Sequence, residues 1–434
     1  MNKSTRIGIV GGGPAGLTAA YYLEKEGYTN VTVFEKSGQV GGKCHTLNHD
    51  GRAYDMGAIM ITKAYKRIKG LIEEFNLETT SFPYFRQMHH QDGTRTKYNK
   101  PKAKSVLRYL KLLSKYKHIW ETPGFQNTPS ELAQPFSSWL ESNGISDLAE
   151  LFAGPVFTYG YGRLDDIPAV YVLKYFNKGN TYTLFQGALW EQLIPECFNF
   201  PVPFYRRLTH GTQPLMTKIA ETLHDVKLNS EITKISRDQT VQIEWKNGLT
   251  GVQERGEYDK LILSHPLESS TLDFLEKTSE EKRLFDSVTH NHYYTIACRM
   301  EGFGYNVHTE IFNKKGQIDI PPDGYPLQFF KAWKESDMCI FYAYSTHALS
   351  QKEIEKNLEQ NIQDIGGKLI EIKSVQKWHY FPHVKSDAIH KGFYDELESL
   401  QGENHTYFNG ALMNFELIEN VTVYSNDLVH RFFK

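Results

Sequence analysis

The sequence is poor in cysteine and has no long apolar segment. Only four of its 434 residues are cysteines, and no two of them stand at C-x-x-C spacing. This scarcity argues against a zinc site and against a disulfide framework, and it is typical of a reducing compartment. No run of about 18 apolar residues occurs, so no segment is expected to span a membrane. We expect neither a bound metal nor a transmembrane helix.

The chain also lacks a strong net charge, a leader segment and an internal repeat. Its formal charge of −2 gives no overall basic field that would attract nucleic acid. The first predicted strand begins at Ile7, which leaves no room for a signal peptide. Residues 428–434 form no hydrophobic anchor. These absences predict a cytoplasmic protein without a nucleic-acid partner.

What is present is a phosphate-binding loop at the start of the chain. Residues 7–10 are typical of a buried parallel strand, and Gly11, Gly13 and Gly16 follow at G-x-G-x-x-G spacing. Such glycines allow a tight turn, close approach of the backbone to a pyrophosphate, and close packing of the next helix. That helix is predicted over residues 17–26. A second strand ends at Glu35, where an acid can bind a ribose hydroxyl. The series predicts a dinucleotide site.

A second glycine pair, Gly41-Gly42, follows together with Lys43, and then comes the segment 54–58, Tyr-Asp-Met-Gly-Ala. This combination resembles the FAD-dependent amine oxidases, protoporphyrinogen oxidases and phytoene desaturases. The resemblance implies FAD, held non-covalently, with the glycine pair along the pyrophosphate and residues 57–59 near the flavin ring. The cofactor-binding residues that it implies are Gly11, Gly13, Ala15, Gly16, Glu35, Lys36, Gly42, Lys43, Gly57, Ala58, Ile59, Val226, Gly410 and Ala411.

Two features of the later chain qualify this resemblance. No second G-x-G-x-x-G occurs, so a separate NADPH domain is not expected. Ala411 stands where the family usually has an acid, which removes one polar contact to the cofactor. A helix is expected from there to Phe433, with its positive end toward the flavin.

The implied fold class is α/β, with a discontinuous Rossmann-like FAD-binding domain, a mixed α+β substrate domain and a helical cap. We expect residues 1–80, 208–270 and 385–434 in the FAD-binding domain. Residues 81–207 would form the cap and the route by which substrate enters, and residues 271–384 would form the substrate domain. Inside the cap, the stretch 95–117 carries nine Lys or Arg residues and no acid. It is either a solvated basic helix or a lid that touches anionic lipid or fatty acid carboxylates transiently.

Several further segments narrow the resemblance. They are Gly42-Lys43-Cys44-His45, Tyr159-Gly160-Tyr161-Gly162 and Phe381-Pro382-His383-Val384. With them the chain resembles the bacterial FAD-containing isomerases of polyunsaturated fatty acids, which convert linoleate to a conjugated diene. The resemblance implies transfer of a hydride from the substrate to flavin N5 and its return to another carbon.

The same resemblance implies residues that bind the fatty acid. Arg86, which precedes His90-Gln91-Asp92-Gly93, would hold the carboxylate through two parallel N–H donors. Its aromatic partner is Phe185, with Phe200 and Phe204 left open. Tyr159 and Tyr161 would face the reacting carbons, although tyrosines in such a segment also serve as core.

Two other functions stay open at this stage. An FAD-dependent amine oxidase or polyene desaturase would use the same cofactor motifs and would produce peroxide or a reduced carrier. A flavin-binding protein without catalysis is the third reading. Peroxide production separates the first alternative from an isomerase, and reduction of the flavin by any substrate excludes the second.

Overall fold

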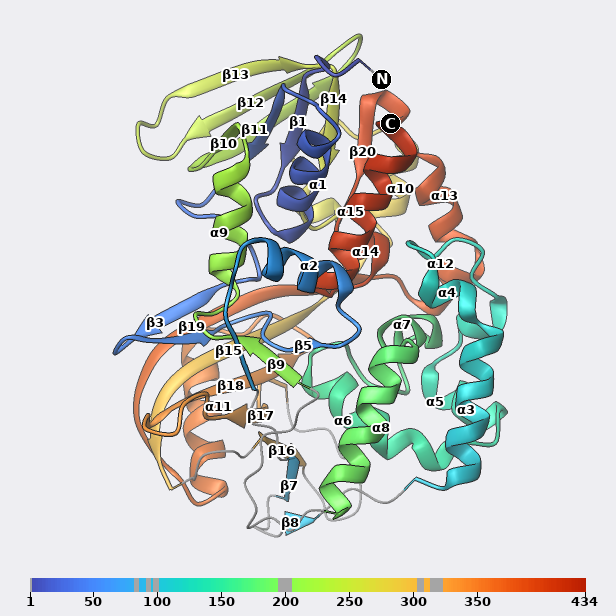
Figure 1. Ribbon diagram of the computed structural model, residues 1–434, viewed down its shortest axis with the longest axis vertical. Coiled ribbons are helices and arrows are strands. Elements are labelled where there is room, and N and C mark those ends of the chain that lie inside the picture. Colours follow the sequence, from blue (N-terminus) through green and yellow to red (C-terminus); the bar gives the residue numbers. More distant parts are fainter. Residues whose placement is uncertain are drawn as a thin grey trace.

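The computed structural model describes residues 2–81, 101–193, 205–302 and 323–434, together with the backbone of the short strands 86–90, 95–96 and 308–312. Figure 1 shows the two sheets around which the molecule is built. None of the helices in these residues is long and apolar enough to cross a membrane.

The first sheet is parallel and has five strands in the order β10-β2-β1-β14-β20. Its strands are short, and β1, β2 and β20 are buried throughout, as expected where both faces are covered. The bounds are β1 Ile7–Val10, β2 Val31–Phe34, β10 Asp225–Lys227, β14 Lys260–Leu263 and β20 Thr406–Phe408. The expected α/β class with a parallel sheet is confirmed.

Helices cover one face of this sheet and a small antiparallel sheet covers the other (Figure 1). Because Gly8 has no side chain, Ile243 reaches the strand: a Cβ at Gly8 would lie 2.6 Å from its Cδ1. The covering elements are α1 Pro14–Lys25, α9 Gln213–Thr222, α15 Ile418–Phe432, β11 Ser230–Arg237, β12 Val241–Asn247 and β13 Gln253–Tyr258.

The second sheet has seven strands in the order β19-β15-β18-β17-β16-β7-β8. Helix α11 (Gln351–Asp364) packs on one of its faces, and the other face carries aromatic side chains. The bounds are β7 Arg86–His90, β8 Arg95–Thr96, β15 Thr289–Glu301, β16 His308–Phe312, β17 Pro326–Phe330, β18 Met338–Ser345 and β19 Lys368–His383. Strands β7 and β8 lie in the region that was predicted as a helical cap. The sequence analysis did not predict them, because the pairing of β7 with β16 leaves no local signal in the sequence.

Helices between β8 and β9 (Tyr205–Leu208) form a third layer beside this sheet (Figure 1). They are α3 Ala103–Lys115, α4 Lys117–Glu121, α5 Phe136–Ser142, α6 Ala149–Thr158, α7 Ala169–Tyr175 and α8 Lys178–Leu193. Helix α3 contains most of the basic stretch. It buries Tyr109 and Leu113 and turns its lysines to solvent, while Leu107 is 68% exposed.

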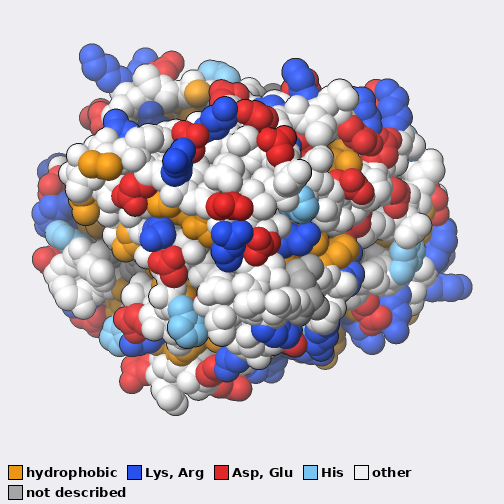
Figure 2. All heavy atoms as spheres, turned by 90° about the horizontal axis from the view of Figure 1, so that it is seen from above, with side chains coloured by type: hydrophobic (Ala, Val, Ile, Leu, Met, Phe, Trp, Pro, Cys, Tyr) orange, Lys and Arg blue, Asp and Glu red, His pale blue; other side chains and the backbone are white. Residues whose placement is uncertain are grey.

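Smaller elements join the layers: β3 Thr46–His49, β4 Arg52–Asp55, β5 Ile61–Thr62, α2 Lys66–Glu74, β6 Thr79–Ser81, α10 Ser279–Phe285, α12 Ser386–His390, α13 Phe393–Ser399 and α14 Ala411–Asn414. The single helix expected up to Phe433 is wrong. The chain breaks at Phe415, whose φ is +83°, and α15 starts afresh at Ile418. Figure 2 shows acidic and basic side chains interspersed over the end of the molecule that is seen from above.

Candidate active site

The phosphate-binding loop between β1 and α1 is shaped by its glycines. Gly11 has a φ of +109°, a conformation that L side chains rarely adopt. A Cβ on Gly16 would stand 1.9 Å from the Gly11 carbonyl oxygen. Helix α1 therefore packs against the loop only because residue 16 is glycine, and its free N–H groups open toward the loop.

Gly13 differs from its two neighbours in the motif. Its φ of −80° suits any residue, and a Cβ there would meet only the Gly42 Cα, at 3.8 Å. Gly42, with φ +51°, faces it across the two loops. The surrounding protein would therefore accept a side chain at Gly13, and the glycine is explained by a ligand that approaches the backbone at this position. This is the cradle that a pyrophosphate needs, and the residues fit FAD.

Glu35, at the end of β2, is 8% exposed and holds this loop. Its carboxylate accepts hydrogen bonds from Gly12 N at 2.9 Å and from Ser37 N at 2.8 Å. The exposed Lys36 follows Glu35. In the neighbouring strand β10, Val226 pairs with Val33 of β2. A carboxylate has about four acceptor positions, so Glu35 retains acceptors for a ribose hydroxyl.

The second glycine loop packs backbone to backbone against the segment after β4. Ala58 N donates to Lys43 O at 3.0 Å, and a Cβ on Gly57 would lie 1.8 Å from that oxygen. Ile59 follows, partly buried. Asp55 lies beneath, where its Oδ1 accepts from Thr46 and Thr212, and burial raises its pKa. Asp55 fixes the loop rather than facing a ligand.

The C-terminal return meets this region from the other side. Gly410, with φ +111°, lies against Ala15: a Cβ on Gly410 would be 3.9 Å from the Ala15 Cβ. Asn409 Nδ2 donates to the Ala15 carbonyl oxygen at 3.1 Å. Ala411 opens α14. The predicted residues at both ends of the chain are therefore neighbours.

One polar residue of this region was missed by the sequence analysis. Glu416, between α14 and α15, accepts from Lys43 Nζ at 2.9 Å and from Phe381 N at 2.9 Å. It stands five residues after Ala411, the position at which this chain lacks the acid that the family pattern contains. An acid shortly after that position was the only signal that could have found it.

Beside these loops, a row of neighbouring aromatic rings crosses the face of the seven-stranded sheet that lies opposite α11. Neighbouring ring centroids in the row lie 4.9–6.0 Å apart. Burial raises the pKa of Tyr161, Tyr293 and Tyr380 well above the ordinary value for tyrosine, so their phenols stay neutral. The rings, in order, are Tyr175, Tyr161, Tyr380, Tyr293, Tyr342 and Phe330.

A narrow cavity of about 20 Å³ opens next to this row. Among the residues that the structure describes, the lining contains no acid, no base and no thiol. Tyr159 and Tyr175 form one wall, and the Tyr159 hydroxyl contacts the Met60 sulfur at 3.9 Å. The lining residues are Thr62, Pro155, Tyr159, Tyr175, Phe176, Asn180, Thr183, Leu184 and Tyr205.

The predicted substrate residues divide between described and undescribed parts of the chain. Tyr159 lines the cavity, and Tyr161 lies within the row, where its hydroxyl donates to the Glu416 carbonyl oxygen at 3.2 Å. Phe185 packs against Tyr109 and Phe152 among the helices, next to Leu184. The backbone of Arg86 lies in β7, but its side chain is outside the described residues, as are Phe200 and Phe204.

Arg86 nevertheless has a definite place in the sheet. His308 of β16 pairs with Arg86 on one side and with Phe330 of β17 on the other. Arg86 therefore lies in register with the last ring of the aromatic row, two strand spacings or about 10 Å away along the sheet.

Comparison with known proteins gives the following matches. The family model for flavin-containing amine oxidoreductases matches residues 14–294. A polyenoic fatty acid isomerase from Ptilota filicina is 25% identical over 263 residues, which cover 53% of this chain and 50% of that protein. The chain thus spans half the length of that relative. An FAD-dependent oxidoreductase, dpchF, from Colletotrichum higginsianum is 23% identical over 94% of this chain and 88% of its own.

Among solved structures, a CLA-producing fatty acid isomerase from P. acnes superposes with a TM-score of 0.87 at 28% identity, and the match covers 100% of both chains. A putrescine oxidase variant superposes with a TM-score of 0.70 at 15% identity, over 99% of both chains, and shows the fold alone.

Proposed function

The chain belongs to the family of flavin-containing amine oxidoreductases and is an FAD-dependent enzyme, and we propose that it isomerises a polyunsaturated fatty acid to a conjugated diene. The observation that carries the proposal is the likeness, over the whole of both chains, to a fatty acid isomerase. The curated relative with a fatty acid isomerase activity supports the same substrate class.

The proposed reaction is redox neutral. A C–H bond of the methylene between two double bonds breaks with both of its electrons, which leaves a pentadienyl cation, and a new C–H bond forms at a terminal carbon of that cation. When bound, FAD supplies the two-electron acceptor and donor at N5. No external oxidant is consumed.

The residues of the chain hold the cofactor and shield the cation. We assign the pyrophosphate to the cradle of Gly13 and Gly42, the ribose to Glu35, and the flavin ring to the segment 57–59. Neutral aromatic faces such as those of Tyr161 and Tyr380 stabilise a nearby cation through their quadrupoles.

The carboxylate end of the substrate would be held by Arg86. Its register with Phe330 supports this assignment, because an acyl chain lying along the aromatic row would bring its head group toward β7. Tyr159 would border the chain, and Phe185 would support the helices around it. A bidentate guanidinium contact suits a carboxylate.

A direct test compares diene formation with oxygen use. The FAD-loaded protein, incubated with linoleate in an oxygen-free buffer without NADPH, is expected to raise the absorbance of conjugated dienes over many turnovers. Stoichiometric peroxide from an amine in air, with no diene from any polyunsaturated acid, would instead establish the oxidase alternative.

A further inference from the structure

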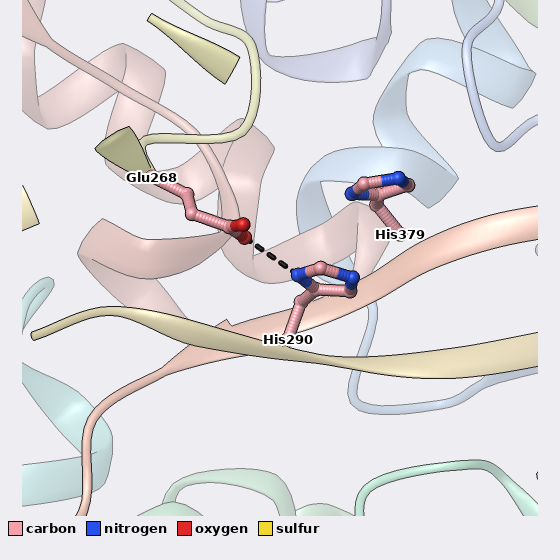
Figure 3. A group of neighbouring side chains, drawn as sticks. All are labelled: Glu268, His290 and His379. Atoms are coloured by element: carbon pink, nitrogen blue, oxygen red, sulfur yellow. Dashed lines mark hydrogen bonds and ion pairs between the residues drawn. The ribbon is translucent and has the colours of Figure 1, made fainter. Parts of the chain in front are cut away.

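Three segments that are distant in the sequence bring together a carboxylate and two imidazoles, those of Glu268, His290 and His379 (Figure 3). Glu268 lies in the loop after β14, and His290 lies near the start of β15. His290 lies at an irregularity in the pairing of β15 with β19, and its ring centroid is 4.7 Å from that of His292, so the two side chains lie on the same side of the sheet. His379 of β19 pairs directly with His292. The same face therefore carries three histidines, with Glu268 reaching in from the other domain.

The three side chains already lie close together. Glu268 Oε2 lies 2.6 Å from His290 Nδ1, and the rings of His290 and His379 stack with centroids 4.1 Å apart. One ligand atom from each of Glu268, His290 and His379 lies within 4.8 Å of the other two. The other ring nitrogen of His290, the buried Nε2, has no hydrogen-bond partner among the described residues.

We propose that Glu268, His290 and His379 form a binding site for a divalent transition metal ion of the Zn²⁺ type. Imidazole nitrogen and carboxylate oxygen are ligands that Zn²⁺ prefers, at about 2.0–2.2 Å. The ion would replace the proton shared by His290 and Glu268, and small rotations about the side-chain bonds would draw the three ligand atoms together. His292, whose ring centroid is 4.7 Å from that of His290, stands beside the site.

The charges around the site bear on its affinity. Histidine binds a metal ion through a ring nitrogen of the neutral imidazole. Lys36 and Lys43 act on His379 and oppose a cation. Glu268 supplies one negative charge at the site, and Glu416 already neutralises Lys43.

The proposed site joins the two sheets. Glu268 follows a strand of the parallel sheet, whereas His290 and His379 belong to the strand pair that carries Tyr293 and Tyr380 on its opposite face. A bound ion would fix the orientation of the cofactor sheet relative to the aromatic row. The sequence analysis predicted no metal, because it considered cysteine spacing and could not see this cross-strand juxtaposition. The inference is independent of the proposed reaction.

Calorimetric titration of Zn²⁺ into the FAD-loaded protein, after treatment with a chelator, tests the proposal. We expect one equivalent to bind with a Kd on the order of 1 µM. His379→Ala, at an exposed position, and Glu268→Gln, which keeps the side-chain volume, should each weaken this binding about a hundredfold. His224→Ala, at an exposed histidine between α9 and β10, is the matched control and should bind Zn²⁺ like the parent.

A second measurement guards against binding elsewhere on the surface. Zn²⁺ should raise the Tm of the parent and of His224→Ala, but not that of His379→Ala, because only a ligand of the native state stabilises it. The proposal is overturned if the parent binds no Zn²⁺ at concentrations on the order of 100 µM. It is equally overturned if all three variants keep the affinity of the parent.

Discussion

The ammonium group of Lys43 lies 2.9 Å from the carboxylate of Glu416 and so joins the second glycine loop to the break between α14 and α15. Both side chains are largely shielded from water, with 25% and 13% of their surface exposed. Glu416 also accepts from Phe381 N, a residue with a φ of +52°. The pair therefore holds three chain segments around the cofactor region.

Breaking this pair should destabilise the protein. Lys43→Met leaves a shielded carboxylate without its cation, and Glu416→Gln removes the charge but keeps an acceptor for Phe381. We expect each variant to lower the free energy of unfolding by about 2 kcal/mol. In a double-mutant cycle measured by urea unfolding, the two changes should be coupled by about 1 kcal/mol or more. Strictly additive effects would show that the ion pair contributes nothing.

The two glycines of the phosphate-binding loop should respond differently to substitution. Gly13→Val meets no protein atom at close range, so the fold should persist while FAD is lost. Gly16→Val would force a Cβ to within 1.9 Å of the Gly11 oxygen and should unfold or rearrange the loop itself. Flavin absorbance and the Tm, measured together, separate these outcomes. Gly70→Ala, in α2 with no described atom within 4 Å of the added Cβ, is the control: it should keep its FAD, and its Tm should stay equal or rise, because alanine favours a helix more than glycine does. Full FAD loading of Gly13→Val would contradict the assignment of the cradle.

Arg86→Ala should weaken binding of a free fatty acid. A hydrogen bond to a charged group contributes about 1.5–3 kcal/mol, which corresponds to a loss of affinity of about ten- to a hundredfold. The FAD content should not change, because the residue lies outside the cofactor loops. Turnover of a methyl ester should fall much less, since the ester has no charge for Arg86 to bind. An equal effect on acid and ester would place the anchor elsewhere, and the exposed lysines of α3 would be the next residues to test.

The stability of the protein should depend on pH through His383. Its ring is 5% exposed, its Nδ1 lies 2.7 Å from the Phe381 carbonyl oxygen, and burial lowers its pKa to about 4. In the unfolded chain the pKa is about 6.5, so between these values the unfolded state binds the additional proton. The free energy of unfolding should therefore fall as the pH drops from 6.5 to 4, by about 3 kcal/mol.

Comparison of His383→Gln with the parent isolates this contribution from those of the carboxylates. The difference in unfolding free energy between the two proteins should change with pH only within that window. A constant difference from pH 8 to pH 4 would show that the pKa of His383 is the same in the folded and the unfolded protein.

The cofactor loops could be predicted from the sequence because their signals are local. Gly11 and Gly16 are close in the sequence as well as in space, and Glu35 ends the second strand of the same unit. The break at Phe415 could not be predicted, since it depends on Glu416 meeting Lys43, 373 residues away. The aromatic row likewise depends on the register between strands: Tyr293 and Tyr380 become neighbours only through the pairing of β15 with β19. Both features arise from tertiary contacts that carry no periodicity along the chain.

The fate of the transferred hydrogen tests the proposed reaction most directly. Linoleate carrying two deuterium atoms on the methylene between its double bonds would be incubated with the FAD-loaded protein without oxygen, and the diene analysed by NMR and mass spectrometry. If the hydrogen leaves and returns as a hydride within one site, the product keeps both deuterium atoms, and one of them lies on a terminal carbon of the former pentadienyl unit. Loss of one deuterium to solvent with every turnover would contradict the account.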